Sequence, residues 1–230
     1  MIPLSDENRT RNVPVASRTI LVTCCLVFLW QRFGGDWGRM AAQALGFTPA
    51  WFFAGGAPEP AFAWVPYAAN LITYQFLHAG WLHLAGNMLC LWIFGDDVED
   101  AFGPAAFIAF YLMAGIAAAL AQALLDVDSG TPVIGASGAV SGLFGAFLVL
   151  HPRSHINVLV PIFIVVDIVR LPAWVVLTFW FAVQLLYDLF DPAAGGGVAF
   201  RAHIGGFLAG LVMTPLFVLA TGRRASRATG

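Results

Sequence analysis

Six strongly apolar segments divide the chain, and they restrict its fold more than any other feature of the sequence. A helix needs roughly 20 apolar residues to cross a hydrocarbon core about 30 Å thick. The segments are Ser17–Gln31, Trp81–Phe94, Pro104–Leu125, Ser137–Leu150, Pro172–Leu189 and His203–Ala220. Several are shorter than a full span, so we expect their helices to extend into flanking residues. The pattern predicts an all-α, polytopic membrane protein with six transmembrane helices.

The composition excludes several other classes of protein. Hydrophobic residues make up 60% of the 230 residues and charged residues only 10%, whereas a soluble domain carries about 25% charged residues. Such hydrophobicity also excludes a disordered chain. The eleven basic residues are all arginine and are spread thinly, so we expect no nucleic-acid partner. Three cysteines, Cys24, Cys25 and Cys90, lie inside apolar segments and have neither a disulfide framework nor zinc-site spacing.

The first apolar segment has a second interpretation. Residues Ile20–Trp30 follow several arginines, as the apolar core of a secretory signal peptide does, but no small-x-small cleavage site comes after them. We therefore interpret this segment as a membrane anchor. No repeat or second domain is evident, so we expect one membrane domain over residues 1–230. Its core would cover about residues 17–221, with a short cytoplasmic tail at each end.

Two connecting segments differ from ordinary loops. Residues Gly34–Pro66 are too polar and too rich in glycine and proline to span a membrane, yet they carry many aromatic side chains. This density is typical of a segment lying among lipid headgroups. Residues Pro161–Leu171 are apolar but contain Asp167 and Arg170. We predict an ordered interfacial loop there.

Arginine placement predicts the orientation in the membrane. With the N-terminus inside, the inner segments carry Arg9, Arg11, Arg18, Arg153, Arg170, Arg223, Arg224 and Arg227. The outer segments carry Arg32, Arg39 and Arg201. Cytoplasmic loops are enriched in basic residues, so both termini are predicted to be cytoplasmic. A bacterial cytoplasmic membrane is favoured, and an organelle membrane stays open.

Polar side chains gather at one depth of this arrangement. The second, fourth and sixth segments all begin on the outer side. Near these starts lie His78, His83, Asn87, Ser137 and His203. Six alternating spans bring all five to similar depth, and polar groups inside a membrane usually mark function.

Glycines indicate which helices touch. Gly138, Gly142 and Gly145 follow Ser137, while Gly206 and Gly210 share a helix face with His203. Small residues at a spacing of four let transmembrane backbones approach closely. Ser137 and His203 would then be neighbours. The alternative is that these glycines only pack the helices and that Ser137 is an ordinary helix cap. The presence of both Ser137 and His203 on matching helices disfavours this alternative.

A serine beside a histidine is the minimal pair for acyl transfer, because the imidazole takes the hydroxyl proton as the serine attacks. The Ser137 amide at a helix start is free to stabilise an oxyanion. His83 and Asn87 share a helix face and can add donors, and His78 is a further donor or fixes a loop. Asp188 and Asp191 are assigned to the solvated interface, which leaves a dyad.

A metal site is the main rival use of the histidines. Helical zinc proteases carry two histidines four residues apart with a glutamate between them, whereas His78 and His83 are five apart with no glutamate between them. His151 and His155 fall on the inner side, where we expect solvated loop residues. We therefore predict no metal and no cofactor.

Three motifs give the chain a recognisable resemblance. They are Gly135-Ala136-Ser137-Gly138, His78-x4-His83-x3-Asn87 and Ala202-His203-x2-Gly206-x3-Gly210. Together, and in this order, they resemble the rhomboid family of intramembrane serine proteases from about Tyr67 to Gly210.

The resemblance implies a six-helix core with the dyad below the outer membrane surface. Ser137 would be the nucleophile and His203 the base. His83, Asn87 and the Ser137 amide would form the oxyanion hole, supported by His78. Glu99 resembles a structural acid of the family.

Two positions depart from the family pattern. Some members carry an aromatic residue four positions after the nucleophile, where it stacks on the catalytic histidine, but this chain has Ser141. The histidine ring must then be held in another way. The Trp-Arg pair often found in the first outer loop is also absent from the sequence.

The implied activity is endopeptidase action on single-span or multi-span membrane protein substrates within the lipid bilayer. Helical substrate must unwind to expose its carbonyl, and the fifth helix with the loop after it would gate entry. Activity should fall as His203 becomes protonated at low pH. A catalytically silent relative that binds transmembrane helices is the alternative. A transporter or channel is disfavoured because its ionisable groups would line a path through the midplane. Substrate and oligomeric state stay open.

Overall fold

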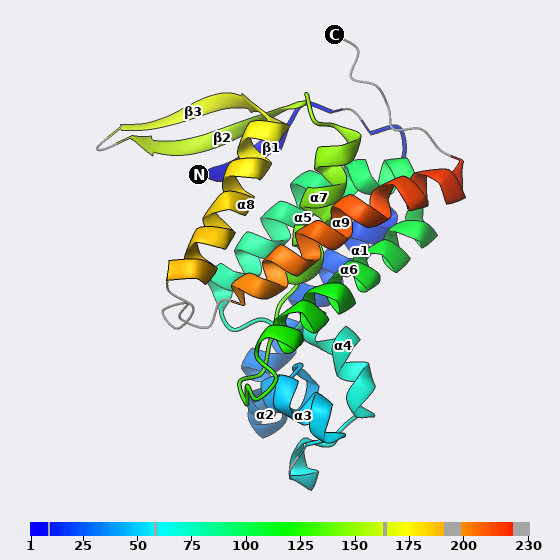
Figure 1. The fold of residues 1–230 in the computed structure, drawn as a ribbon, viewed down its shortest axis with the longest axis vertical. Coiled ribbons are helices and arrows are strands. Elements are labelled where there is room, and N and C mark those ends of the chain that lie inside the picture. Colours follow the sequence, from blue (N-terminus) through cyan, green and yellow to red (C-terminus); the bar gives the residue numbers. More distant parts are fainter. Residues whose placement is uncertain (9, 58, 163–164, 191–198, 223–230) are drawn as a thin grey trace.

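The computed structural model describes residues 1–8, 10–57, 59–162, 165–190 and 199–222. Figure 1 shows one helical bundle with a small β-sheet at one end and the short helices α2 and α3 at the other. The long helices are α1 (Val15–Phe33), α5 (Trp81–Phe102), α6 (Pro104–Leu125), α7 (Ser137–Leu150), α8 (Ala173–Phe190) and α9 (Phe200–Thr221). The short ones are α2 (Gly35–Leu45), α3 (Pro49–Ala54) and α4 (Asn70–Thr73), with 3₁₀ turns at Pro60–Phe62, Tyr67–Ala69 and Tyr74–Phe76.

Several helices are long and apolar enough to cross a membrane. Among the described residues, α1, α6, α8 and α9 each meet this condition, and α5 meets it together with Tyr67–Phe76, from which it bends by 84°. Helix α7 is apolar but only 14 residues long. The protein is therefore a multi-pass membrane protein, and the number of six spans stays a prediction.

The predicted segments match the observed helices closely. Helices α6 and α7 have the predicted boundaries, and α1, α8 and α9 differ by one to three residues at each end. Helix α5 runs eight residues further than expected, through an acidic turn to Phe102. The acidic residues are tolerated there because Asp97 and Glu99 are buried against the N-terminal segment rather than facing lipid.

Helix α7 lies at the centre of the bundle, and its residues 138–147 are all buried. Its glycines allow this position. A methyl group on Gly138 would lie 2.6 Å from Cβ of Ala118 on α6, and one on Gly142 would overlap Cβ of Ala114. Short apolar helices are stable inside the bundle because neighbouring helices, not lipid, surround them.

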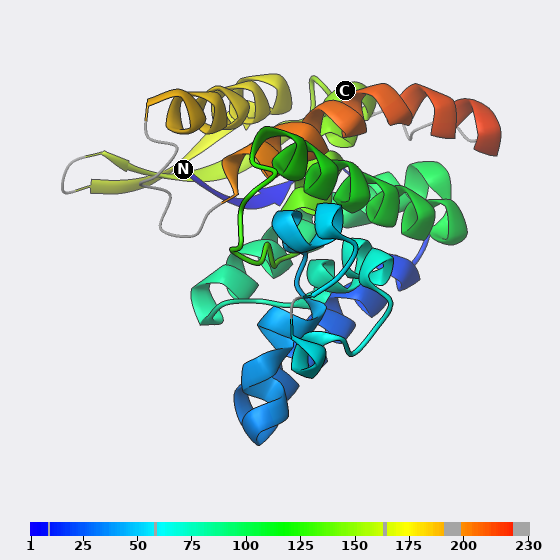
Figure 2. The same cartoon turned by 60° about the horizontal axis from the view of Figure 1, so that its bottom comes forward.

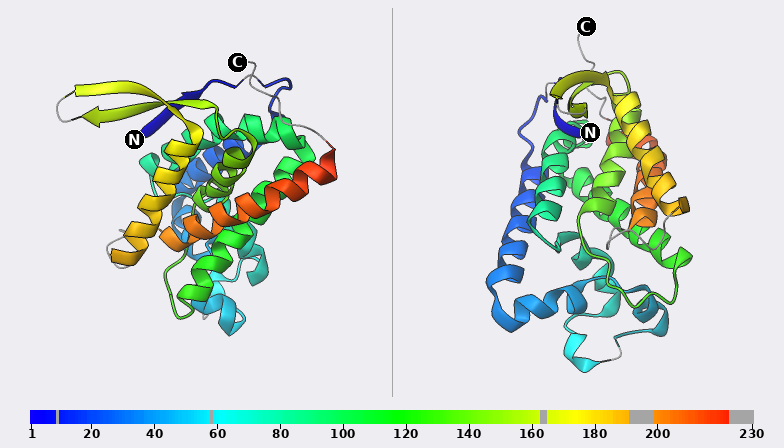
Figure 3. Two further views of the ribbon diagram at one scale, coloured as in Figure 1. Left: turned by 45° about the horizontal axis from the view of Figure 1, so that its top comes forward. Right: turned by 90° about the vertical axis from the view of Figure 1, so that its left-hand side faces the viewer.

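A three-stranded antiparallel sheet corrects the all-α prediction. Its strands are β1 (Ile2–Asp6), β2 (His155–Ile162) and β3 (Val165–Pro172), in the order β1-β2-β3. The arms of β2 and β3 project beyond the helices (Figures 1 and 3). The prediction of a loop at Pro161–Leu171 was thus wrong. This segment is rich in β-branched residues, which favour strands.

The sheet also shows the two-residue period of a half-buried strand. Ile156 and Val158 are fully buried, while Asn157 lies opposite Ser5 and Arg170 on the other face. Strands β2 and β3 form a local hairpin, whereas the third strand, β1, lies some 150 positions away in the sequence, at the N-terminus.

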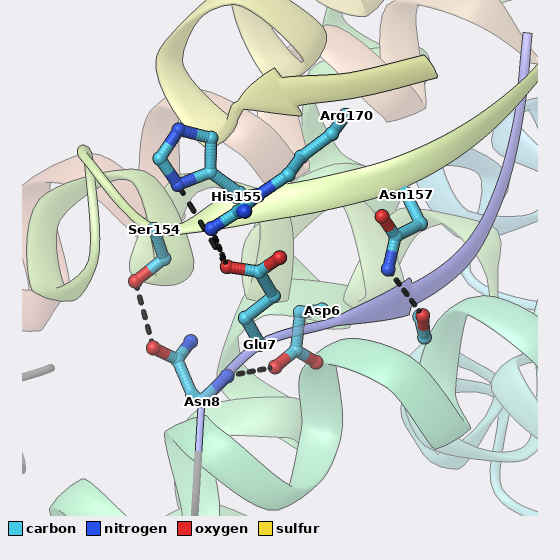
Figure 4. Close-up of polar contacts among 8 residues, drawn as sticks. Asp6, Glu7, Asn8, Ser154, His155, Asn157 and Arg170 are labelled. Carbon is cyan, nitrogen blue, oxygen red and sulfur yellow. Dashed lines mark hydrogen bonds and ion pairs between the residues drawn. The ribbon is translucent and has the colours of Figure 1, made fainter. Parts of the chain in front are cut away.

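Polar contacts hold the N-terminal segment against this hairpin (Figure 4). Glu7 pairs with Arg170 and lies 3.9 Å from Nδ1 of His155. The Ser154 hydroxyl donates to Oδ1 of Asn8 at 2.7 Å. His155 therefore belongs to the sheet rather than to a loop.

His151 is also not the solvated loop residue that we predicted. It is buried directly after α7, with its ring 5.3 Å from that of Phe147. Burial lowers the pKa of His151 below its ordinary value, opposed by the negative charge of Asp100.

The segment Gly34–Pro66 folds into α2, α3 and a 3₁₀ turn at the end away from the sheet (Figure 2). Trp64 packs between Trp30 and Trp37, with ring centroids 6.3 Å and 5.2 Å apart. Its location among headgroups stays a prediction. Of the residues used for the orientation, Arg9, Arg223, Arg224 and Arg227 lie outside the described residues.

Candidate active site

The starts of α5, α7 and α9 and the end of α8 lie at the end of the bundle opposite the sheet (Figures 1 and 3). These are the elements that carry the predicted site residues. The topology therefore brings segments separated by more than 100 residues to one end of the molecule.

The closest helix contact runs between α7 and α9 along their glycines. A methyl group on Gly206 would overlap the carbonyl oxygen of Gly138, and one on Gly210 would overlap that of Gly142. Gly145 is equally close to the carbonyl of Phe207. Two backbones approach this closely only when neither carries a side chain at the crossing.

This contact brings the surroundings of Ser137 and His203 together. Gly138 follows Ser137, and a methyl group on it would lie 4.0 Å from the carbonyl oxygen of Ala202, the residue before His203. No hydrogen bond joins the Ser137 hydroxyl to His203 within the described part of the chain. Such bonds are often long in enzymes without substrate and tighten only when it binds.

His83 lies over the turn that carries Ser137. Gly135 has φ +126°, and a methyl group on it would lie 2.7 Å from Nε2 of His83 and 3.7 Å from Oγ of Ser137. Only glycine fits here, because both its backbone conformation and the space exclude a side chain. The Nε2 edge of His83 thus faces the turn of the predicted nucleophile.

The hydrogen bond to Nδ1 of His83 indicates which ring nitrogen carries the proton. The amide N–H of Ala79 donates to Nδ1 of His83 at 3.3 Å. A nitrogen that accepts a hydrogen bond is unprotonated, so in the neutral ring Nε2 carries the hydrogen. His83 therefore presents an N–H donor toward the Gly135 turn.

Asn87 and His78 lie near His83 and lack partners. Asn87 is 7% exposed, and its Nδ2 has no acceptor within the described residues. His78 is buried, its ring lies 5.2 Å from that of His83 in an edge-on arrangement, and neither of its ring nitrogens has a partner there. Its backbone N–H donates to Oε1 of Gln31. Buried polar groups without partners are rare in folded proteins, so each one calls for an explanation.

Sequence reasoning missed Tyr74, which holds the nucleophile turn. Its carbonyl accepts from the Gly135 amide at 2.9 Å, and its buried hydroxyl donates to the Gly115 carbonyl on α6 at 2.6 Å. An aromatic residue in an apolar context gives no sequence signal for such a role.

Sequence reasoning also missed Gln184 of α8. Its Oε1 lies 2.9 Å from Nδ1 of His203, and its side chain is buried. Ser141, at the position where some relatives carry an aromatic residue, instead donates its hydroxyl to the carbonyl of Ser137 at 2.7 Å. The support for His203 therefore comes from α8.

The acidic residues Asp188 and Glu99 have structural partners. Asp188 was assigned to the solvated interface, but it pairs with Arg201 across α8 and α9 at 2.9 Å. Asp191 lies outside the described residues. At the opposite end of α5, the buried Glu99 accepts from the amides of Ala16 and Ser17 at 2.9 Å and 2.7 Å and caps α1.

One group of side chains has the ligand atoms for a cation. Oxygen atoms of Asp6, Asp96 and Asp97 lie within 4.8 Å of one another. The group is at the sheet end of the molecule, away from the helix starts described above, and Asn8 donates to Asp97 within it.

A bundle of membrane-spanning helices with serine and histidine at one end defines a class of integral membrane protein rather than one protein. Comparison with known families identifies the family within this class. The model of the Rhomboid domain matches residues 66–220. The chain belongs to the rhomboid family.

Named relatives support this assignment. The chain is 31% identical over 144 residues to Rhomboid-related protein 2 of Mus musculus, covering 63% of this chain and 46% of that protein. It is 44% identical over 79 residues to Rhomboid protease GluP of Bacillus subtilis, covering 34% and 15%. RHOMBOID-like protein 5 of Arabidopsis thaliana is 39% identical over 79 residues, covering 34% and 26%. The matches thus span less than half the length of each relative. The family contains both proteases and inactive relatives.

Proposed function

We propose that this protein is an intramembrane serine endopeptidase in which Ser137 is the nucleophile and His203 the base. One observation carries the proposal. The N–H edge of His83 faces the glycine turn of Ser137, directly beside the glycine crossing of α7 and α9 that leads to His203. A purely structural glycine crossing has no need of a histidine donor that faces the glycine turn before the serine.

The proposed reaction is acyl transfer followed by hydrolysis. Nε2 of His203 takes the proton of the Ser137 hydroxyl as its oxygen attacks the substrate carbonyl. The protonated imidazole then donates this proton to the leaving amine, and the peptide C–N bond breaks. Water, activated by the same ring, hydrolyses the acyl-enzyme. No metal or cofactor takes part.

The developing oxyanion needs preorganised donors. We assign this role to the amide of Ser137, Nε2–H of His83 and Nδ2–H of Asn87. The unpartnered Nδ2 of Asn87 supports the assignment, since a donor of this kind is satisfied when the oxyanion forms. His78 would support the ring of His83, which it touches edge-on.

The proposed substrates are single-span or multi-span membrane proteins, cleaved in or near a transmembrane segment. A substrate helix must unwind locally, because the peptide carbonyls of an intact helix are hydrogen-bonded. We propose entry beside α8, whose buried residues are few, namely Ala173, Val176, Leu177 and Gln184. The loop after α8, which we also expected to gate entry, lies outside the described residues.

The rest of the proposal concerns topology. We propose six spans, with α7 completing the set, in one membrane domain. The site then lies near the outer face, and both termini are cytoplasmic, in a bacterial cytoplasmic membrane. The arginine distribution supports this orientation.

The alternative is a catalytically silent relative that binds transmembrane helices. The missing hydrogen bond between Ser137 and His203 in the described residues is the observation that favours it. Such a protein would have no need of the His83 donor that faces the Gly135 turn.

The test is cleavage of a tagged single-span substrate in liposomes, together with labelling of the protein by a fluorophosphonate. Wild type should cleave and be labelled, whereas Ser137→Ala should do neither and His203→Ala should lose at least 10³-fold in rate. Gly86→Ala, on the exposed face of α5, is the matched control. Cleavage that survives in Ser137→Ala would overturn the proposal, and a wild type that is neither labelled nor active would favour the silent alternative.

A further inference from the structure

The buried amide of Gln184 is the polar partner of Nδ1 of His203. It reaches across from α8, a helix that carries no motif of the family resemblance. We infer that Gln184 is a positioning residue that fixes the tautomer and orientation of the His203 ring. This inference rests on the proposed function, because it concerns how the proposed base is held.

The orientation of the amide follows from its second contact. Nε2 of Gln184 lies 3.4 Å from the carbonyl oxygen of Trp180, one turn earlier on α8. A backbone carbonyl only accepts hydrogen bonds, so the NH₂ group of the amide must point toward it. Oε1 of Gln184 is thereby left facing His203.

This orientation determines the tautomer of His203. An amide oxygen only accepts, so the hydrogen of the neutral imidazole must be on Nδ1. Nε2 then keeps its lone pair. That nitrogen is the one that must take the proton of Ser137, so Gln184 selects the reactive tautomer of the base.

Among the described residues, the other groups near His203 do not supply this function. The Ser141 hydroxyl is engaged with the Ser137 carbonyl. Asp188 is engaged with Arg201. The rings of Trp180 and Phe200, with centroids 6.0 Å and 6.3 Å from that of His203, contact it without a hydrogen-bond acceptor.

The location of Gln184 also argues against a role in packing alone. It is the polar member of the buried residues of α8, the others being Ala173, Val176 and Leu177, and an aliphatic side chain there would fill the same space without a desolvation cost. Its amide is neutral, so it selects the tautomer without adding a charge to the site. A carboxylate in its place would also stabilise the protonated imidazole.

The test compares Gln184→Leu and Gln184→Glu with wild type in the cleavage assay across pH 5 to 9. For Gln184→Leu we expect kcat to fall about ten- to a hundredfold with little change in KM, because the ring spends time in the wrong tautomer. For Gln184→Glu we expect most of the activity at high pH and an acid limb of the pH profile moved about one unit upward.

A direct readout does not depend on cleavage. In the Ser137→Ala background, ¹⁵N NMR of His203 should show hydrogen on Nδ1 alone, and a mixture of both tautomers once Gln184→Leu is added. A single unchanged tautomer in that double variant would overturn the inference. An acid limb of the pH profile that does not move in Gln184→Glu would also overturn the inference.

Asp188→Asn is the matched control. It breaks the ion pair with Arg201 on the same face of α8, one turn from Gln184, and touches neither ring nitrogen of His203. It should loosen the contact between α8 and α9 yet leave the acid limb and the tautomer unchanged. If Asp188→Asn changes both the acid limb and the tautomer as the Gln184 variants do, the docking of α8 is responsible rather than the positioning of the His203 ring by Gln184. Failure of the proposed function is distinguishable, because wild type itself would then show no Ser137-dependent cleavage.

Discussion

The carbonyl oxygen of Gly138 on α7 occupies the space where a side chain of Gly206 on α9 would lie. This contact is one of the close glycine contacts that set the distance between the two helices that carry Ser137 and His203. The position of the proposed dyad therefore depends on backbone packing one residue away from the serine and three away from the histidine.

Gly206→Ala should force α7 and α9 apart, because the blocking atom belongs to the backbone and cannot rotate away. Overpacking of this kind costs about 1–3 kcal/mol. We expect a lower unfolding midpoint in detergent and a loss of cleavage larger than the loss of folded protein. Thermal unfolding and the cleavage rate measure the two effects.

Gly86→Ala provides the comparison for this prediction. Gly86 also lies inside a long helix, but a methyl group there would meet no atom within 4 Å. Alanine favours helix over glycine by about 1 kcal/mol, so this variant should be as stable as wild type or more stable. Equal destabilisation by both substitutions would contradict the role given to the Gly138–Gly206 contact.

Much of the helical fold could be predicted from the sequence, because hydropathy and span length act locally. Pro104–Leu125 and Ser137–Leu150 were predicted at their observed boundaries. The β2–β3 hairpin was missed because Asp167 and Arg170 were interpreted as marks of a loop, although the β-branched residues around them favour strands. The pairing of Ile2–Asp6 with His155–Ile162 could not be predicted in this way, because the two segments are far apart in the sequence.

Some residues of the candidate site could likewise be predicted from the sequence, and others could not. Motif spacing and alternating topology predicted that Ser137, His83 and His203 would share one end of the bundle. Gln184 and Tyr74 could not be found, because each acts through a contact with a distant helix. An amide or a phenol in an apolar segment gains such a role only from tertiary packing.

Glu99→Gln should destabilise the fold at the N-terminal end of α1. The buried carboxylate accepts two backbone amides, those of Ala16 and Ser17. The amide of glutamine offers one oxygen, so one buried N–H loses its charged acceptor at a cost of about 1–3 kcal/mol. Asp100→Asn, one residue later, keeps one oxygen for the exposed hydrogen bonds from Arg11 and Asn12, which use a single carboxylate oxygen, and should cost clearly less. Urea unfolding followed by tryptophan fluorescence compares them, and equal losses would contradict the assigned cap.

Asp6 should make the stability of the sheet depend on pH. Burial raises the pKa of Asp6 from 3.8 to about 6, opposed by the Asn8 amide and increased by the charge of Asp96. The folded state thus binds more protons than the unfolded state between about pH 4 and pH 6, and stability falls as pH rises through this range. Asp6→Asn should remove this loss and gain on the order of 1–2 kcal/mol at pH 7.5, after allowing for solvent screening.

Hydrogen exchange of the β1 and β2 amides at pH 4 and pH 7.5 measures the Asp6 effect. The variant and wild type should agree at pH 4 and differ at pH 7.5. Asp36→Asn, which alters an exposed ion pair with Arg39 on α2, should change neither value. A gain from Asp6→Asn that is the same at both pH values would show that charge is not the cause.

Tyr74→Phe separates the two bonds that hold the nucleophile turn. The substitution removes the hydroxyl that donates to Gly115 but keeps the backbone carbonyl that accepts from Gly135. We expect a stability loss of about 1 kcal/mol and slower fluorophosphonate labelling of Ser137, because Tyr74 then loses its hydrogen bond to the α6 backbone. Tyr67→Phe is the matched control, since its hydroxyl bonds to the backbone of Thr48 near α3, outside the site. It should lose similar stability without slowing the labelling of Ser137. If both variants slow labelling equally, general loosening of the fold explains the effect, and Tyr74 has no specific part in holding the turn.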